Sequence, residues 1–508
     1  MIEDRTNNNR AAPDSRASDP SQLPPSPGTG PAWNVTDLPV PPDFNFRNAL
    51  RIIGPGAIVL SMSIGLGEWV LGPLVVTQYG FTMLWVVTVA IILQLALNLE
   101  FIRYTVYTGE PVINGFLRLA PHPLFWGGIY ILFSLFHAGW PAWAAASAAP
   151  LFAGFTGHMP GPGDESIMRW LGIINLLVCA AIVAFGNKVE RTLEIVNWFM
   201  VIFVFGFLLS VCLLIVPAET WWAGVLGFFG LTPGFEFLLI PDNVSWILVG
   251  GFAAFAGAGG MANLTVSNYM RDKGIGMGRE VGYIPTLVGG RKVVVSPVGS
   301  VFPAHGTNMA RWRVWWQYVR CDQILVWAAG CFVGMFLNCI LAAHVVPAGT
   351  QLSGLSIGAF QAEYLAREGG ELLGFVTLVN GFWILFGSQL VTIDMMARIN
   401  TDLIWSMSGR VRGMAGNDIR RLYYCLLGAF VLWGCIAINL AQPRALVLIS
   451  SNVAGFILVV SAVHILLLNH MALPRAVRSP LWARGLVACT ALFYGFFFVQ
   501  NLLELFGR

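Results

Sequence analysis

A single carboxylate, Glu68, lies inside a long apolar segment of this 508-residue chain. The segment begins at Gly54, and Gly65 and Gly67 stand directly before the carboxylate. A charged side chain at membrane depth costs about 3 kcal/mol, and residues that bear this cost usually belong to a binding site or an ion pathway. Carboxylate oxygens are ligands for cations. Glu68 is therefore a candidate cation ligand.

A second apolar segment has an unusual centre over residues 256–260, where only glycine and alanine occur. Met261 and Asn263 follow them. Glycine weakens a helix by about 1 kcal/mol per position relative to alanine, so the pattern predicts non-helical backbone at about 257–260 and, in the first segment, at about 65–67. Unwound backbone at membrane depth occurs where it lines a cavity or a site. The alternative is that the glycines allow close helix packing, which explains the glycines but not Glu68.

These two segments belong to a chain dominated by membrane spans. Hydrophobic residues make up 56% of it and charged residues 11%, whereas a soluble domain carries about 25% charged residues. Apolar runs of roughly 20 residues predict transmembrane helices. Eleven such spans are predicted, at 52–71, 82–104, 125–151, 167–185, 194–216, 245–269, 322–346, 371–396, 421–440, 443–468 and 485–505.

The distribution of basic residues predicts the orientation of the spans. Eight of the 29 Lys and Arg residues lie in the connection 271–320. With eleven spans and the N-terminus inside, 25 basic residues fall on the inner face and four on the outer face. Because short loops rich in Lys and Arg stay in the cytoplasm, we predict an integral protein of the cell (inner) membrane with a cytoplasmic N-terminus.

The two glycine-interrupted segments are spans one and six. Interrupted helices at corresponding positions of two halves are typical of transporters built from two inverted repeats. We therefore expect an all-α membrane protein with the LeuT-type 5+5 inverted repeat, in which helices 1 and 6 are broken. The substrate would bind between the half-helices, near the middle of the membrane.

The rest of the chain adds few chemical signals. Residues 1–44 form a polar tail that we expect to be disordered, and residues 45–508 form the transmembrane domain. Within the cytoplasmic loop 271–320, the stretches 281–285 and 292–299 predict a short β-hairpin. No phosphate-binding loop, zinc-protease motif or Cys-x-x-Cys pair occurs. We therefore expect no enzyme activity, no cofactor and no nucleic-acid partner; the partners are the lipid bilayer and the substrate.

From about residue 50 to 470 the chain resembles the Nramp family of divalent-metal transporters, which has the LeuT-like fold. The family's first span opens with Gly-Pro-Gly, as at Gly54, and its Asp-Pro-Gly-Asn metal motif falls in register on 65–68, where only Gly67 matches. The sixth-span Ala-x-x-Met motif matches Ala258 and Met261. The eighth span is similar around Gln389.

Several positions depart from the family pattern. The family's aspartate is Gly65 here, its asparagine is Glu68, and its sixth-span histidine is Asn263. The acidic residues that the family uses for proton movement in the third span are absent, and His137 lies in that stretch. A histidine can titrate near neutral pH; a neutral, packed His137 is an equally good interpretation.

The resemblance implies a secondary transporter that moves a divalent metal cation of the Mn, Fe or Mg class by alternating access. The implied binding residues are Gly65, Gly67, Glu68, Ala258, Met261, Asn263 and Gln389, with His137 as a possible proton-linked group. A thioether favours softer ions over Mg²⁺. One alternative is an organic solute, such as an amino acid, whose amine pairs with Glu68. Another is a non-transporting receptor or assembly subunit, which has no use for a buried charge.

Overall fold

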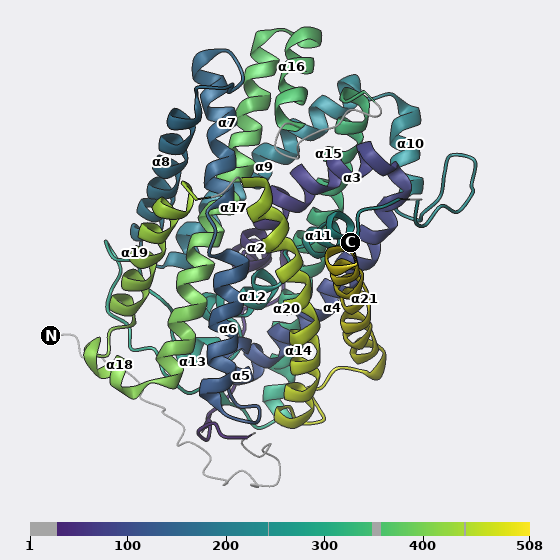
Figure 1. Cartoon of the computed structure of the whole chain (residues 1–508). Helices are drawn as coiled ribbons and strands as arrows, with labels where there is room; N and C mark the ends of the chain where they lie inside the picture. Colours follow the sequence, from purple (N-terminus) through teal and green to yellow (C-terminus); the bar gives the residue numbers. More distant parts are fainter. Residues whose placement is uncertain (1–27, 242, 348–356, 441–442, 508) are drawn as a thin grey trace, which may run out of the picture.

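The computed structural model describes residues 28–241, 243–347, 357–440 and 443–507. Helices account for nearly all of its regular structure (Figure 1). The first five spans are formed by α2 (Pro55–Ser63), η2 (Ile64–Leu71) and α3 (Gly72–Tyr79); η3 (Phe81–Met83) and α4 (Leu84–Thr108); α6 (Pro123–Ala138) and α7 (Ala142–Thr156); α8 (Glu165–Ala184); and α9 (Val189–Ile215).

The remaining spans are formed by α11 (Trp246–Phe255) and α12 (Met261–Lys273); α14 (Gly306–Arg320), η4 (Cys321–Ala328) and α15 (Ala329–Val345); α17 (Glu371–Met407); α19 (Ile419–Ala437); α20 (Pro443–Ala472); and α21 (Leu481–Phe506). The connections contain β1 (Asn34–Val35), α1 (Phe46–Ile52), α5 (Val112–Phe116), α10 (Ala218–Gly227), α13 (Gly278–Val281), β2 (Ser300–Val301), α16 (Ile357–Gly369) and α18 (Gly409–Met414).

The predicted fold class is confirmed. In the described residues, ten helical segments are long and apolar enough to cross a membrane, and α11 is a shorter apolar helix. With α12, α11 forms the sixth span, so each of the eleven predicted spans falls on a helix. The connecting helices α5 and α18 lie toward one end of the bundle and α10 and α16 toward the other (Figure 1). This alternation is what an eleven-span path requires.

Span six is broken as predicted, but span one is not unwound. Its backbone runs through residues 65–67 as part of a wide π-helix, η2, between α2 and α3. In a π-helix the amides bond five residues back, so the backbone groups stay satisfied within the span. Here the glycines allow close contact with other spans, the alternative that the sequence had left open.

Span three contains an interruption that the sequence analysis did not predict. Helix α6 ends at Ala138 and α7 begins at Ala142, after Pro141. Proline lacks the amide hydrogen that would continue the helix. Span seven also begins earlier than predicted, because α14 already covers the end of loop 271–320 and continues into η4.

Loop 271–320 and the tail pair with each other, contrary to two expectations. Residues 28–44 were expected to be disordered, but β1 pairs in parallel with β2, and Asn34 aligns with Ser300. The Trp315 indole donates a hydrogen bond to Pro39 O at 2.9 Å, and Arg311 Nη1 donates one to Leu38 O at 2.7 Å. The predicted hairpin over 281–285 and 292–299 is wrong, because the strand of this loop pairs with the tail. Residues 1–27 lie outside the described part of the chain.

Candidate functional site

The break in span six is built by glycines in conformations that other residues rarely adopt. Helix α11 ends at Phe255 and α12 begins at Met261. Between them Gly259 has φ +80° and Gly260 has φ +49°, both in the left-handed region. A Cβ on Gly260 would lie 2.8 Å from Ala454 Cα, so α20 leaves no room for a side chain there.

A glutamine from span two holds the broken ends together. Gln94 Nε2 donates to Ala254 O at 3.1 Å, and Gln94 Oε1 accepts from Gly259 N at 3.3 Å. The same Nε2 lies 2.8 Å from the Tyr494 hydroxyl, which donates to Ala253 O at 3.2 Å. These contacts satisfy carbonyls and an amide that the missing helical turn leaves free. Gln94 was not among the predicted site residues, although its amide inside an apolar span was a usable signal.

Span one touches the break directly through its glycines. A Cβ on Gly67 would lie 1.6 Å from Phe255 O. This oxygen belongs to the backbone, so it cannot move aside as a flexible side chain could. A Cβ on Gly65 would lie 1.8 Å from Ser388 Oγ, and Ser388 donates a hydrogen bond to Ser61 O at 3.0 Å. Spans one, six and eight therefore meet at these glycines, as the predicted site requires.

Glu68 is buried but lies on a different face of span one. A Cβ on Gly334 would lie 1.7 Å from Glu68 Oε2, so the carboxylate packs against α15. Cys331 on the same helix is its polar neighbour. Neither carboxylate oxygen has a geometrically good hydrogen bond within the part of the chain that the structure describes. The structure therefore places Glu68 beside span seven, whereas Gly67 lies against the break.

Ala258, Met261 and Asn263 are all buried at the break. The side chain of Asn263 begins a series of hydrogen-bonded polar side chains that runs away from the break. Asn263 Nδ2 donates to Asn98 Oδ1 at 2.9 Å, and Asn98 Nδ2 donates to Gln323 Oε1 at 3.2 Å. Asn263 Oδ1 has no hydrogen-bond partner among the described residues. A buried amide oxygen without a donor is an acceptor available to a ligand.

The polar chain ends at the start of span one. Gln323 Nε2 donates to Asp322 Oδ2 at 2.8 Å. The Asp322 carboxylate also accepts from Gly54 N at 2.9 Å and from Gly56 N at 2.8 Å, so it caps α2. Asp322 and Gln323 were missed, because nothing in the sequence relates the start of span seven to the start of span one.

The other two predicted residues differ in their surroundings. Gln389 Oε1 accepts from Ala144 N at 3.0 Å and so caps the first turn of α7, while its Nε2 is unpaired in the described residues. His137 is fully buried, with its ring 6.0 Å from that of Phe255 at the break. Neither ring nitrogen of His137 has a partner in the ranges described. His137 therefore lies beside the break, and Gln389 contacts α7.

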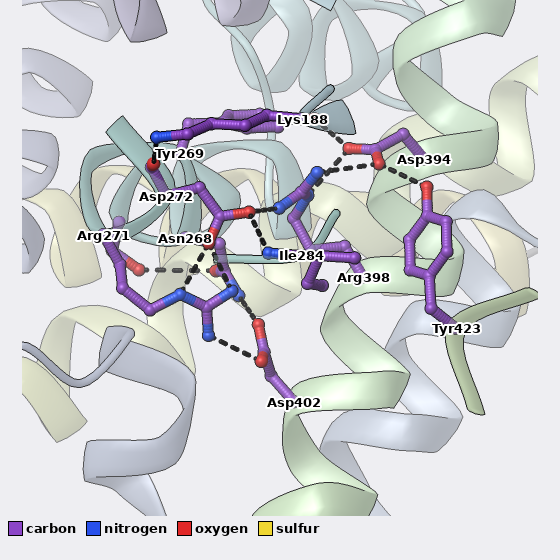
Figure 2. Close-up of polar contacts among 11 residues, drawn as sticks. Lys188, Asn268, Tyr269, Arg271, Asp272, Ile284, Asp394, Arg398, Asp402 and Tyr423 are labelled. Atoms are coloured by element: carbon purple, nitrogen blue, oxygen red, sulfur yellow. Dashed lines mark hydrogen bonds and ion pairs between the residues drawn. The ribbon is translucent and has the colours of Figure 1, made fainter. Parts of the chain in front are cut away.

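A buried ionic cluster lies at the end of α12 that is farther from the break, and it includes residues of α17 and α19 (Figure 2). Arg398 binds Asp394 through two hydrogen bonds of 2.9 and 3.0 Å and also pairs with Asp272. Tyr269 and Tyr423 each donate a hydroxyl to Asp394, at 2.8 and 2.5 Å. Asp394 and Arg398 are four residues apart on α17, whereas their partners come from α12 and α19.

Arg271 extends the cluster along α12. Its Nε donates to Asp272 at 2.7 Å and its Nη1 to Asp402 at 2.6 Å. Asn268 donates to the other oxygen of Asp402 at 2.6 Å (Figure 2). All the charged members are at most 2% exposed. The second half of span six is thereby joined to span eight through charged hydrogen bonds shielded from water, which are stronger than neutral ones.

Comparison with known proteins identifies the fold. No family model matches the chain, and no curated protein sequence matches it. A crystal structure of a mutant manganese transporter from Eremococcus coleocola superposes with a TM-score of 0.63 at 13% identity, covering 94% of this chain and 89% of that one. The same transporter in complex with an aromatic bis-isothiourea substituted compound gives a TM-score of 0.58 at 14% identity, with the same coverage of both chains. The chain therefore has the fold of the Eremococcus coleocola manganese transporter.

Proposed function

We propose that this protein is a secondary transporter that moves a divalent metal cation across the membrane by alternating access. The observation that carries the proposal is the break in span six, which meets spans one and eight inside a fold shared with a manganese transporter. Alternating access requires a site at mid-membrane that opens to one side at a time.

The ligands for the cation would come from the break itself. Carbonyl groups at the carboxyl end of α11 carry partial negative charge and favour a cation. Asn263 Oδ1 is a buried acceptor without a partner in the described residues, and Met261 adds a thioether. In the same residues no group of three His, Cys, Asp or Glu side chains comes together to hold a metal ion. The proposed site is therefore one of neutral oxygens and a sulfur. Glu68, which packs against α15 on another face of span one, would supply negative charge from within that span.

This ligand set favours a Mn or Fe class ion over Mg²⁺. A thioether binds softer ions, and Mg²⁺ prefers oxygen ligands in octahedral geometry. Access to the break from the loop side would require the ionic cluster of Arg271, Asp272, Asp394, Arg398 and Asp402 to open. We propose that this cluster forms the inner gate.

Metal binding to the purified protein tests the ligand assignment. Met261→Ala removes the sulfur and spares every oxygen, so we expect affinity for Mn²⁺ and Cd²⁺ to fall about ten-fold while affinity for Mg²⁺ changes little. Isothermal titration with each ion measures this. Met414→Ala, at an exposed methionine of α18, is the matched control. An unchanged ratio of Cd²⁺ to Mg²⁺ affinity in Met261→Ala would remove Met261 from the site.

We further propose that loop 271–320 faces the cytoplasm, which the 25:4 distribution of basic residues supports. Cysteine probes at Gly161 and Gly413, both exposed at connections on opposite ends, distinguish the orientations. In a chain whose exposed Cys425 and Cys489 are replaced by serine, an impermeant reagent added to intact cells should label the probe at 161 and spare that at 413. Labelling only at 413 would reverse the topology.

A further inference from the structure

A cavity of about 470 Å³ opens at the loop end of the bundle, apart from the break in span six. Five segments line it. They are the tail before α1, the end of α1, the residue before α9, the stretch from the end of α12 through α13, and α14. The lining carries five basic side chains and one carboxylate. A concave site with such an excess of positive charge concentrates anions.

Two of the five basic groups are already paired. Arg271 bonds to Asp272 and Asp402 as part of the ionic cluster. Lys273 pairs with Glu194 and lies 3.7 Å from Glu190 on α9. The one carboxylate of the lining, Asp272, is engaged by Arg271 and Arg398.

The other three basic groups, Arg51, Lys188 and Arg279, have no carboxylate oxygen within 4.0 Å in the described chain. Lys188 Nζ lies 4.1 Å from the centre of the Tyr283 ring and 3.4 Å from Asp272 O. These contacts hold its ammonium group at the cavity without neutralising it. Three positive charges around one cavity repel one another unless an anion joins them.

The position of the three residues indicates the kind of anion. Arg51 lies in the last turn of α1, shortly before span one, and Lys188 is the last residue before span five. Arg279 lies on α13, after span six. The cavity is therefore at the depth where a helix leaves the membrane, and its volume falls in the range of small-ligand sites, about 300–1,000 Å³. Arginine and lysine together favour phosphate, whose oxygens accept forked and single charged hydrogen bonds.

We propose that this cavity binds a phosphate-bearing anion, held by Arg51, Lys188 and Arg279. The anion is either the headgroup of an acidic phospholipid or a free phosphate compound, since both present the same oxygens. Because the cavity joins the segment before span one to the end of α12, a bound anion would hold these two parts of the molecule together. The proposal does not depend on which substrate crosses at the break.

The test measures thermal stability of the full-length protein with two sources of phosphate. One arm adds pyrophosphate to the protein in neutral detergent, with chloride at matched ionic strength as reference. The other compares nanodiscs of phosphatidylcholine containing phosphatidic acid with nanodiscs of phosphatidylcholine containing a fatty acid, an anionic lipid without phosphate, at equal negative charge. We expect one source to raise the melting temperature in a saturable way, as a ligand of the folded state does.

The double variant Arg51→Gln/Arg279→Gln assigns the effect to the cavity. Both side chains are exposed, so the variant should fold, and the apparent affinity for the active probe should fall about ten-fold or more. Arg410→Gln, at an exposed arginine of α18, should respond as the parent does. The proposal is overturned if neither probe stabilises the parent beyond its reference, or if the double variant responds as the parent does.

Discussion

Glu68→Gln is expected to abolish cation uptake while leaving the yield and the melting temperature of the protein close to those of the parent. Both carboxylate oxygens of Glu68 are buried, their polar neighbour is Cys331, and neither has a hydrogen bond of good geometry in the described residues, so the substitution disturbs few contacts that hold the fold. It preserves the size and one oxygen and removes the charge. A cation at mid-membrane needs a nearby negative charge, because the low dielectric strengthens charge interactions and isolates an unpaired ion.

The control is Glu371→Gln, which changes the same group at an exposed position at the start of α17. It should transport as the parent does. The measurement is initial uptake of Mn²⁺ into proteoliposomes, normalised to the amount of reconstituted protein. If Glu68→Gln transports Mn²⁺ at the parent rate, the metal hypothesis loses its charged residue, even though the fold assignment stands.

Arg398→Gln is expected to destabilise the protein by about 3–5 kcal/mol, the range observed when one partner of a buried ion pair is removed. The side chain is fully buried between Asp394 and Asp272. Its loss leaves two carboxylates without their shared cation. The melting temperature in detergent should therefore fall by many degrees, whereas Arg410→Gln should leave it unchanged.

Adding Asp394→Asn to Arg398→Gln separates the loss of the pair from the loss of the arginine alone. The double variant should recover part of the stability, because it removes the carboxylate that loses its cation, whereas Asp272 keeps its pair with Arg271. If Arg398→Gln has the same melting temperature as the Arg410→Gln control, the cluster contributes no stability. That result would argue against its role as the inner gate.

The sequence predicted the break in span six but not the course of span one, although both carry dense glycine. At the break, two adjacent glycines take left-handed φ values, a conformation that glycine alone adopts at little cost. In span one, Gly65 and Gly67 stay helical and instead admit Ser388 Oγ and Phe255 O. Glycine content alone does not tell a helix break from a close helix contact. The residues that decide between them, Phe255, Ser388 and Ala454, lie far from these glycines along the chain.

The direction of Glu68 was beyond prediction for a related reason. The side chain follows the phase of η2, and a wide helical turn shifts that phase relative to an ordinary α-helix. Polar contacts between distant segments could not be predicted from the sequence either. Asp394 and Arg398 are four residues apart on one helix, a spacing that the sequence displays, whereas Asp272 reaches Arg398 only across spans six and eight. The tail was predicted to be disordered because of its polar composition. Its contacts with α14 depend on backbone carbonyls, which composition does not reveal.

Uptake into proteoliposomes tests the central claim most directly. Purified protein is reconstituted, and entry of Mn²⁺ is followed with and without an excess of Mg²⁺ or of mixed amino acids outside. The proposed function predicts saturable Mn²⁺ entry that empty vesicles lack and that amino acids do not inhibit. Absence of Mn²⁺ entry, together with saturable uptake of an amino acid by the same vesicles, would contradict the metal assignment and favour an organic solute paired with Glu68.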